Sequence, residues 1–205
     1  MRILLLDNHD SFTWNLAHDL ERFDAEVTVV REVNSPLDGF DGVVLSPGPG
    51  LPSEHPQLIE LVAQCIECAV PMLGVCLGMQ AIVEHFGGRL RNLAAPLHGV
   101  ARRLEVVGDC PVLGGEADEV GHYHSWVADE NTWPDVLEVT ARERQDEKSE
   151  ESGESGNEDM ILAMRHRSLP VYGVQFHPES VLTPGGRAML GRWLADVEKV
   201  QGQGT

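Results

Sequence analysis

The chain opens with apolar runs that alternate with amphipathic stretches. Residues 2–7 (RILLLD) are almost continuously apolar, as in a buried strand, whereas apolar residues between 12 and 23 recur at spacings of three and four, as on one face of a helix. The same two patterns continue along the chain and predict strands at 26–31, 42–45 and 70–75 and helices at 54–68 and 77–86. This alternation predicts a parallel sheet with helices on both faces.

The pattern changes after residue 89, where helical spacing fades and short β-like segments are separated by Gly, Pro, Asp and Asn. Such segments predict antiparallel strands added to the parallel core. They are residues 100–107, 119–127, 136–143 and 160–165, and they are followed by a buried-strand pattern at 171–176 and an amphipathic helix at 187–200. With no internal repeat and no linker, we expect residues 1–205 to form a single α/β domain with an open, mainly parallel sheet.

The charge of the chain limits the kinds of partner that it can bind. The 15 Lys and Arg against 33 Asp and Glu give a net charge of −18, which disfavours binding to nucleic acid or anionic lipid. Residues 143–159 (ERQDEKSEESGESGNED) hold eight acids and two bases, so we expect an acidic, flexible loop there, more as a tolerated surface insertion than as a regulatory segment. No apolar run approaches the ~18 residues of a membrane span, and we expect a cytoplasmic protein.

The four cysteines are expected to be reduced thiols, because the chain is long and poor in cysteine. Cys65 and Cys68 form a C-x-x-C, but they fall late in a helical pattern with no second pair to complete a zinc site. We therefore interpret both as helix residues, with a thiol oxidoreductase as the alternative.

Chemistry is expected where the parallel strands end, because ligands collect at the carboxyl ends of such strands. Three loops stand out there, at 46–50 (SPGPG), 75–78 (VCLG) and 177–180 (HPES). In the second, Cys76 lies between two glycines with the spacing of a strand-to-helix elbow, where the start of a helix favours thiolate over thiol. The alternative is a small core cysteine.

A thiolate nucleophile needs a proton acceptor that a third group orients. His177 and Glu179 lie two residues apart at a strand end and can supply both. Backbone N–H groups of Leu77 and Gly48 are suitable donors to an oxyanion, although Pro-Gly-Pro-Gly can also be an ordinary tight turn. His122 and His124 share one face of a strand, but with no third ligand nearby we do not expect a metal site there.

Five motifs in order resemble the class I glutamine amidotransferases, and most closely the glutaminase components of anthranilate synthase and aminodeoxychorismate (para-aminobenzoate) synthase. They are DNHDSFTWNL at 7–16, SPGPG at 46–50, GVCLGMQ at 74–80, YHS at 123–125 and YGVQFHPESVLTPGG at 172–186. The resemblance implies a flavodoxin-like fold and hydrolysis of L-glutamine to glutamate and ammonia, with Cys76 as nucleophile, His177 as base and acid, and Glu179 as its orienting partner.

By motif position, the resemblance also implies a glutamine-binding set that joins the oxyanion donor Leu77: Gly48, Pro49, Gly50, Gln80, Ser125 and Trp126. We expect no metal and no cofactor in this chain. The resemblance implies that ammonia passes to a larger, chorismate-binding synthase subunit (component I), where magnesium would be bound. The sequence leaves open the anthranilate and the para-aminobenzoate branch. Two further alternatives are a cysteine hydrolase of another amide or ester and a non-catalytic, glutaminase-like regulatory subunit.

Overall fold

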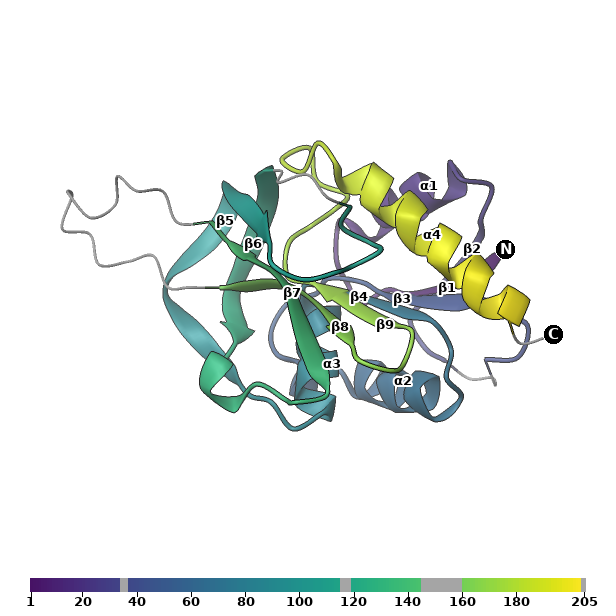
Figure 1. Ribbon diagram of the computed structural model, residues 1–205, viewed down its shortest axis with the longest axis horizontal. Coiled ribbons are helices and arrows are strands. Elements are labelled where there is room, and N and C mark those ends of the chain that lie inside the picture. The colour runs from purple at the N-terminus through teal and green to yellow at the C-terminus, as the bar shows by residue number, and fades with distance from the viewer. Residues whose placement is uncertain (34–36, 115–118, 145–159, 204–205) are drawn as a thin grey trace.

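Five parallel strands form the half of the sheet that the apolar runs predict. In the computed structural model, which describes residues 1–33, 37–114, 119–144 and 160–203, they lie in the order β2-β1-β3-β4-β9 (Figure 1). The strands are β1 (Arg2–Leu6), β2 (Glu26–Val30), β3 (Gly42–Leu45), β4 (Met72–Val75) and β9 (Val171–Val174). Every pairing among them is parallel, so their carboxyl ends meet at one edge.

Four antiparallel strands extend the sheet beyond β9, in the order β8-β7-β5-β6. They are β8 (Ile161–His166), β7 (Leu137–Glu143), β5 (Leu90–Val106) and β6 (Glu119–Ala128). The prediction of strand from residue 100 was wrong for β5, which begins at Leu90. Its first half is mostly exposed and its register with β6 shifts twice, so the residues show no alternation of apolar and polar positions.

Helices cover both faces of the sheet, as predicted. α1 (Thr13–Glu21) and α4 (Gly186–Gln203) lie on one face, and α2 (Pro56–Glu67) and α3 (Leu77–His85) lie on the other (Figure 1). Along β1, Ile3 and Leu5 belong to the first core and Leu4 and Leu6 to the second. A strand buried on both faces reads as a continuous apolar run, which is why RILLL shows no alternation.

The helix predicted at 54–68 is α2, which begins at Pro56, while Glu54 belongs to a preceding 3-10 turn, η1 (Pro52–Glu54). His55 between them has φ −122° and ψ 77°, outside the helical region. The ring of a proline disfavours the helical conformation at the preceding residue, whereas proline itself fits the first helical position. A second short 3-10 turn, η2 (Glu130–Thr132), follows β6.

Two expectations concern the surroundings of this sheet. Most of the predicted acidic loop at 143–159 lies outside the described residues, which stop at 144 and resume at 160. Within the described ranges, none of the helices combines the length and the apolar character needed to cross a bilayer.

Trp193 of α4 is fully buried, and a Cβ added to Gly42 at the start of β3 would lie 3.2 Å from its ring. Trp193→Ala is expected to lower the free energy of unfolding by about 3–5 kcal/mol, because it leaves a large cavity between α4 and the sheet. Trp193→Phe should cost much less, since the indole N–H has no hydrogen-bond partner among the described residues. Urea unfolding checks both values, and equal midpoints for Trp193→Ala and the wild type would contradict this account of the packing.

Candidate active site

Cys76 occupies a sharp elbow between β4 and α3. Its φ of 51° and ψ of −102° place a non-glycine residue at positive φ, a strained conformation that surrounding packing must hold. A Cβ on Gly74 would lie 2.5 Å from the carbonyl carbon of Gly78, and one on Gly78 would lie 2.6 Å from the carbonyl oxygen of Leu45. The two glycines therefore serve close backbone packing, while the cysteine itself takes the strained turn.

Cys76 lies at the start of α3, and the residue is 4% exposed. The partial positive charge of a helix N-terminus favours an anion at this position. The side-chain amide of Gln175 donates a hydrogen bond to Sγ over 3.6 Å. Cys76 is thus a cavity-lining residue with a polar partner, and not only a small member of the apolar core.

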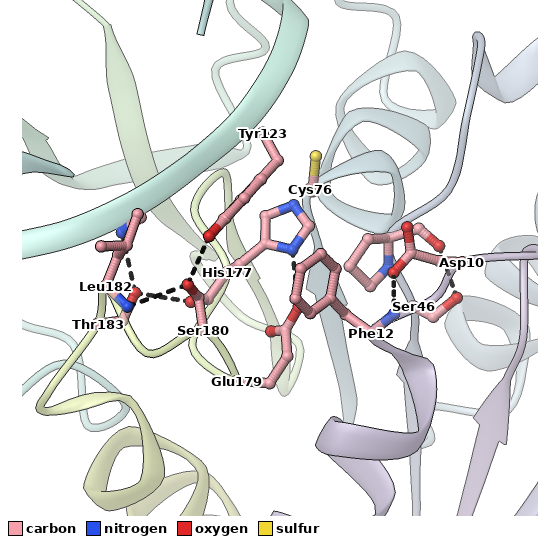
Figure 2. A network of polar contacts seen from close by, with 12 residues as sticks. Asp10, Phe12, Ser46, Cys76, Tyr123, His177, Glu179, Ser180, Leu182 and Thr183 are labelled. Atoms are coloured by element: carbon pink, nitrogen blue, oxygen red, sulfur yellow. Dashed lines mark hydrogen bonds and ion pairs between the residues drawn. The ribbon is translucent and has the colours of Figure 1, made fainter. Parts of the chain in front are cut away.

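The imidazole of His177 lies between Cys76 and Glu179 (Figure 2). Its Nδ1 is 2.7 Å from Oε1 of Glu179, and both side chains are buried. Burial acts to lower the pKa of His177, but the Cys76 sulfur and the Glu179 carboxylate outweigh it and raise the pKa to about 10. Nε2 has no hydrogen bond of good geometry among the described residues, so it is available to the sulfur or a ligand.

The turn that carries His177 is tied to β6 on the neighbouring part of the sheet (Figure 2). The backbone N–H of His177 donates to the carbonyl of Gly121 over 3.0 Å. Thr183 accepts from the N–H of Gly121 over 2.9 Å and donates to the carbonyl of His177 over 2.7 Å. The hydroxyls of Tyr123 and Ser180 are 3.0 Å apart. These contacts fix the backbone beneath both His177 and Glu179.

Two aromatic rings pack against the imidazole. The ring centroid of Tyr123 is 4.9 Å and that of Phe12 is 5.6 Å from His177, both nearly edge-on. Phe12 comes from the loop after β1 and Tyr123 from β6, so the sequence alone gives no reason to bring them together. The only signal for their place is that each falls inside one of the motifs, DSF and YHS.

A cavity of about 250 Å³ opens beside Cys76. Except for Leu77, every residue predicted to bind glutamine lines it; the lining residues are Gly48, Pro49, Gly50, Cys76, Gln80, Pro96, Leu97, His98, Tyr123, His124, Ser125 and Trp126. Sequence reasoning missed the segment Pro96–His98 of β5, because its register against β6 is set by strand pairing and not by any chemical motif.

The two predicted oxyanion donors come from loops that touch. A Cβ on Gly48 would lie 2.7 Å from Cδ2 of Leu77 and 2.8 Å from the carbonyl oxygen of Asn8. Asn8 holds the loop in turn, since its N–H donates to Oγ of Ser46 over 2.9 Å and its side-chain amide donates to the carbonyl of Ser46 over 2.9 Å. Asn8 therefore holds the start of the SPGPG loop, and Gly48 has no room for a side chain against Leu77.

Gln80 lies one helical turn after Cys76, as predicted, but its side-chain N–H groups face the protein. Nε2 donates to the carbonyl of Trp126 over 2.8 Å and to Oε1 of Gln175 over 3.3 Å. The side-chain N–H₂ of Gln80 is thus engaged by Trp126 and Gln175.

His122 and His124 form a buried pair on β6, with Nδ1 of His122 2.9 Å from Nε2 of His124. Burial, followed by electrostatic interaction with the neighbouring histidines and Arg102, lowers the pKa of His122 to about 3. Burial, followed by interaction with His177, lowers the pKa of His124 to about 4. Both imidazoles are therefore neutral at pH 7. Within the described ranges, no three His, Cys, Asp or Glu side chains are grouped to hold a metal ion.

The C-x-x-C lies away from the cavity. Cys65 is buried in α2, and burial raises the pKa of its thiol to about 12, while Cys68 is exposed at the helix end. A thiol that resists ionisation is a poor redox nucleophile. The geometry thus favours the interpretation of both cysteines as helix residues.

Known proteins resemble this chain in sequence and in fold. The chain is 38% identical to anthranilate synthase component 2 of Mycobacterium tuberculosis, over 95% of this chain and 82% of the relative. It is 39% identical to aminodeoxychorismate synthase of Streptomyces griseus, over 93% of this chain and 25% of that longer protein. A glutamine amidotransferase structure from Thermotoga maritima superposes with a TM-score of 0.76 at 14% identity, covering 96% of this chain and 97% of that one.

Residues 4–197 match the glutamine amidotransferase class-I family. The match spans nearly all of the sheet, both helical layers and the three loops that surround Cys76. The chain therefore belongs to the class-I glutamine amidotransferases.

Proposed function

We propose that this glutamine amidotransferase hydrolyses L-glutamine to glutamate and ammonia with Cys76 as nucleophile, His177 as general base and acid, and Glu179 as the group that orients the imidazole. The observation that carries the proposal is the meeting of a strained, cavity-lining cysteine with a buried His–Glu pair joined over 2.7 Å. Nucleophile, base and orienting group in this order form a catalytic triad.

The proposed reaction has two halves. The proton of Sγ moves to Nε2 of His177, and the thiolate attacks the side-chain carbonyl of glutamine. The imidazolium then protonates the leaving ammonia, which leaves a thioester on Cys76. Water attacks the thioester with His177 again as base, the C–S bond breaks to release glutamate, and the proton taken from water returns to Sγ. Glu179 stabilises the imidazolium in both halves, as its effect on the pKa of His177 supports.

Backbone N–H groups are the proposed donors to the oxyanion. Leu77 is the first residue of α3, and Gly48 packs against its side chain, so both loops meet beside the sulfur. Losing one such donor costs about 3 kcal/mol of transition-state stabilisation in other enzymes. We propose that the rest of the glutamine lies against Gly48, Pro49, Gly50, Gln80, Ser125 and Trp126. Thiolate, imidazole and backbone donors supply this chemistry without a metal or cofactor in the chain.

The partner in this proposal is a larger, chorismate-aminating synthase subunit that binds magnesium and receives the ammonia. The relatives named anthranilate synthase component 2 and aminodeoxychorismate synthase support such a partner. Ammonia is mostly protonated in neutral water, so direct transfer keeps it nucleophilic. Co-purification from the native cell identifies the branch, since the synthase that binds this chain defines the product.

Cys76→Ser and His177→Ala are each expected to lower glutamine hydrolysis by at least about 10²-fold. The first removes the nucleophilic thiol that gives up the proton, and the second removes the base that receives it. Glutamate release, measured with the synthase present, checks this. Amination driven by added ammonium should persist in both variants. Cys68→Ser, an exposed thiol away from the cavity, is the matched control and should keep wild-type turnover.

Two outcomes would favour the alternatives. Normal turnover in Cys76→Ser would contradict the triad. A wild-type chain that binds the synthase but shows no glutaminase activity, with or without it, would favour a regulatory subunit. Covalent labelling of Cys76 by a glutamine-like diazo ketone supports the proposed substrate, whereas labelling only by peptide electrophiles would favour another cysteine hydrolase.

Glu179→Gln tests the orienting group through pH. The Glu179 carboxylate helps to raise the pKa of His177, so its removal lets the imidazolium lose its proton at lower pH. The alkaline limb of kcat/KM should therefore move down by about one pH unit, and turnover should fall about tenfold or more. Glutamate release between pH 6 and 10 measures both. Glu60→Gln on α2 is the control, and an alkaline limb equal in all three proteins would contradict the role.

A further inference from the structure

Gln175 lies beside the nucleophile for a reason of topology. It directly follows β9, as Cys76 directly follows β4, and the two strands are parallel neighbours with Val75 opposite Val174. The backbone N–H of Cys76 donates to the carbonyl of Val174 over 2.8 Å, which extends the pairing past the strand ends. The first residue after each strand therefore shares one edge of the sheet.

The Gln175 side chain is fully buried and its place is fixed. Its backbone N–H donates to the carbonyl of Leu162 over 2.8 Å. Its Oε1 accepts from Nε2 of Gln80 over 3.3 Å, and its Nε2 donates to Sγ of Cys76 over 3.6 Å. No other side-chain amide among the described residues is recorded as a donor to this sulfur.

The direction of this hydrogen-bond chain follows from its far end. The carbonyl of Trp126 can only accept, so the group of Gln80 that faces it, over 2.8 Å, must be the N–H₂. The same N–H₂ faces Gln175, which must then present its oxygen to Gln80 and its own N–H₂ to the sulfur. A backbone carbonyl of β6 thus determines that a donor, and not an acceptor, faces Cys76.

We propose that Gln175 is a further catalytic residue, whose amide N–H stabilises the anionic sulfur of Cys76. The inference deepens the proposed function and rests on it for the reaction. A neutral thiol is a weak acceptor, and a hydrogen bond to an ionised group is roughly twice as strong as a neutral one. The bond strengthens when the proton leaves Sγ for Nε2 of His177, and weakens again when the sulfur becomes an uncharged thioester.

Gln175→Met tests the donor, because methionine has similar length and no N–H. The rate of Cys76 alkylation by iodoacetamide is measured against pH in the full chain, with the labelled peptide read by mass spectrometry. We expect the alkylation midpoint of Cys76 to rise by about one pH unit in the variant, which is about tenfold less thiolate at any pH well below the midpoint. Cys68, exposed in the same chain, is the internal control and should not change.

Gln175→Glu is the second variant, and Gln64→Met on α2 is the matched control for loss of a glutamine amide elsewhere. Gln175→Glu keeps the acceptor for Gln80 but puts an acid beside the sulfur, so it should raise the midpoint at least as far as Gln175→Met. It also serves if the methionine variant fails to fold, as judged by the thermal unfolding midpoint.

The proposal would be overturned if Cys76 had the same alkylation midpoint in a folded Gln175 variant as in Gln64→Met. In the glutaminase assay, Gln175→Met should lower kcat about tenfold while KM stays within about twofold, as expected for an interaction made with the reacting sulfur. Because alkylation uses no glutamine, it reports on Gln175 even if glutamine hydrolysis itself is absent. Failure of the proposed function and failure of this inference are therefore distinguishable.

Discussion

The close approach of α3 to the ends of β3 and β4 is the constraint on which the rest of the site depends. Gly78 has no room for a side chain against the Leu45 carbonyl, and Gly74 has none against Gly78. With the helix held this near, the chain passes from strand to helix through a sharp turn at Cys76, which has a positive φ. The helix start, the SPGPG loop and the His177 turn then converge on one sulfur.

Much of the fold follows from the sequence because the central strands are buried on both faces. Ile3 and Leu5 enter one core and Leu4 and Leu6 the other, which makes β1 an unbroken apolar run. The first half of β5 could not be predicted in the same way. This segment is a strand because it pairs with β6, and its exposed residues show no alternation of apolar and polar positions.

Some residues of the candidate site could likewise be predicted from the sequence, and others could not. Cys76, His177 and Glu179 stand out in the sequence because each follows a buried strand, and the 2.7 Å His–Glu contact depends on residues two apart. Phe12, Tyr123 and Gln175 do not stand out, although they touch the same side chains. Their contacts join elements far apart along the chain, and no local spacing encodes which aromatic ring or amide will face a given sulfur or imidazole.

The antiparallel half of the sheet also supports the candidate site. β6 is the outermost strand, but its Gly121 is hydrogen-bonded to Thr183, which in turn is hydrogen-bonded to His177. Ser125 and Trp126 of β6 line one side of the cavity. His177, which follows the central strand β9, is thus also anchored to the edge strand that lines one side of the cavity. A displacement of β6 would therefore reach the imidazole and the cavity lining through the same few contacts, whereas Cys76 is joined to β9 by its own backbone hydrogen bond.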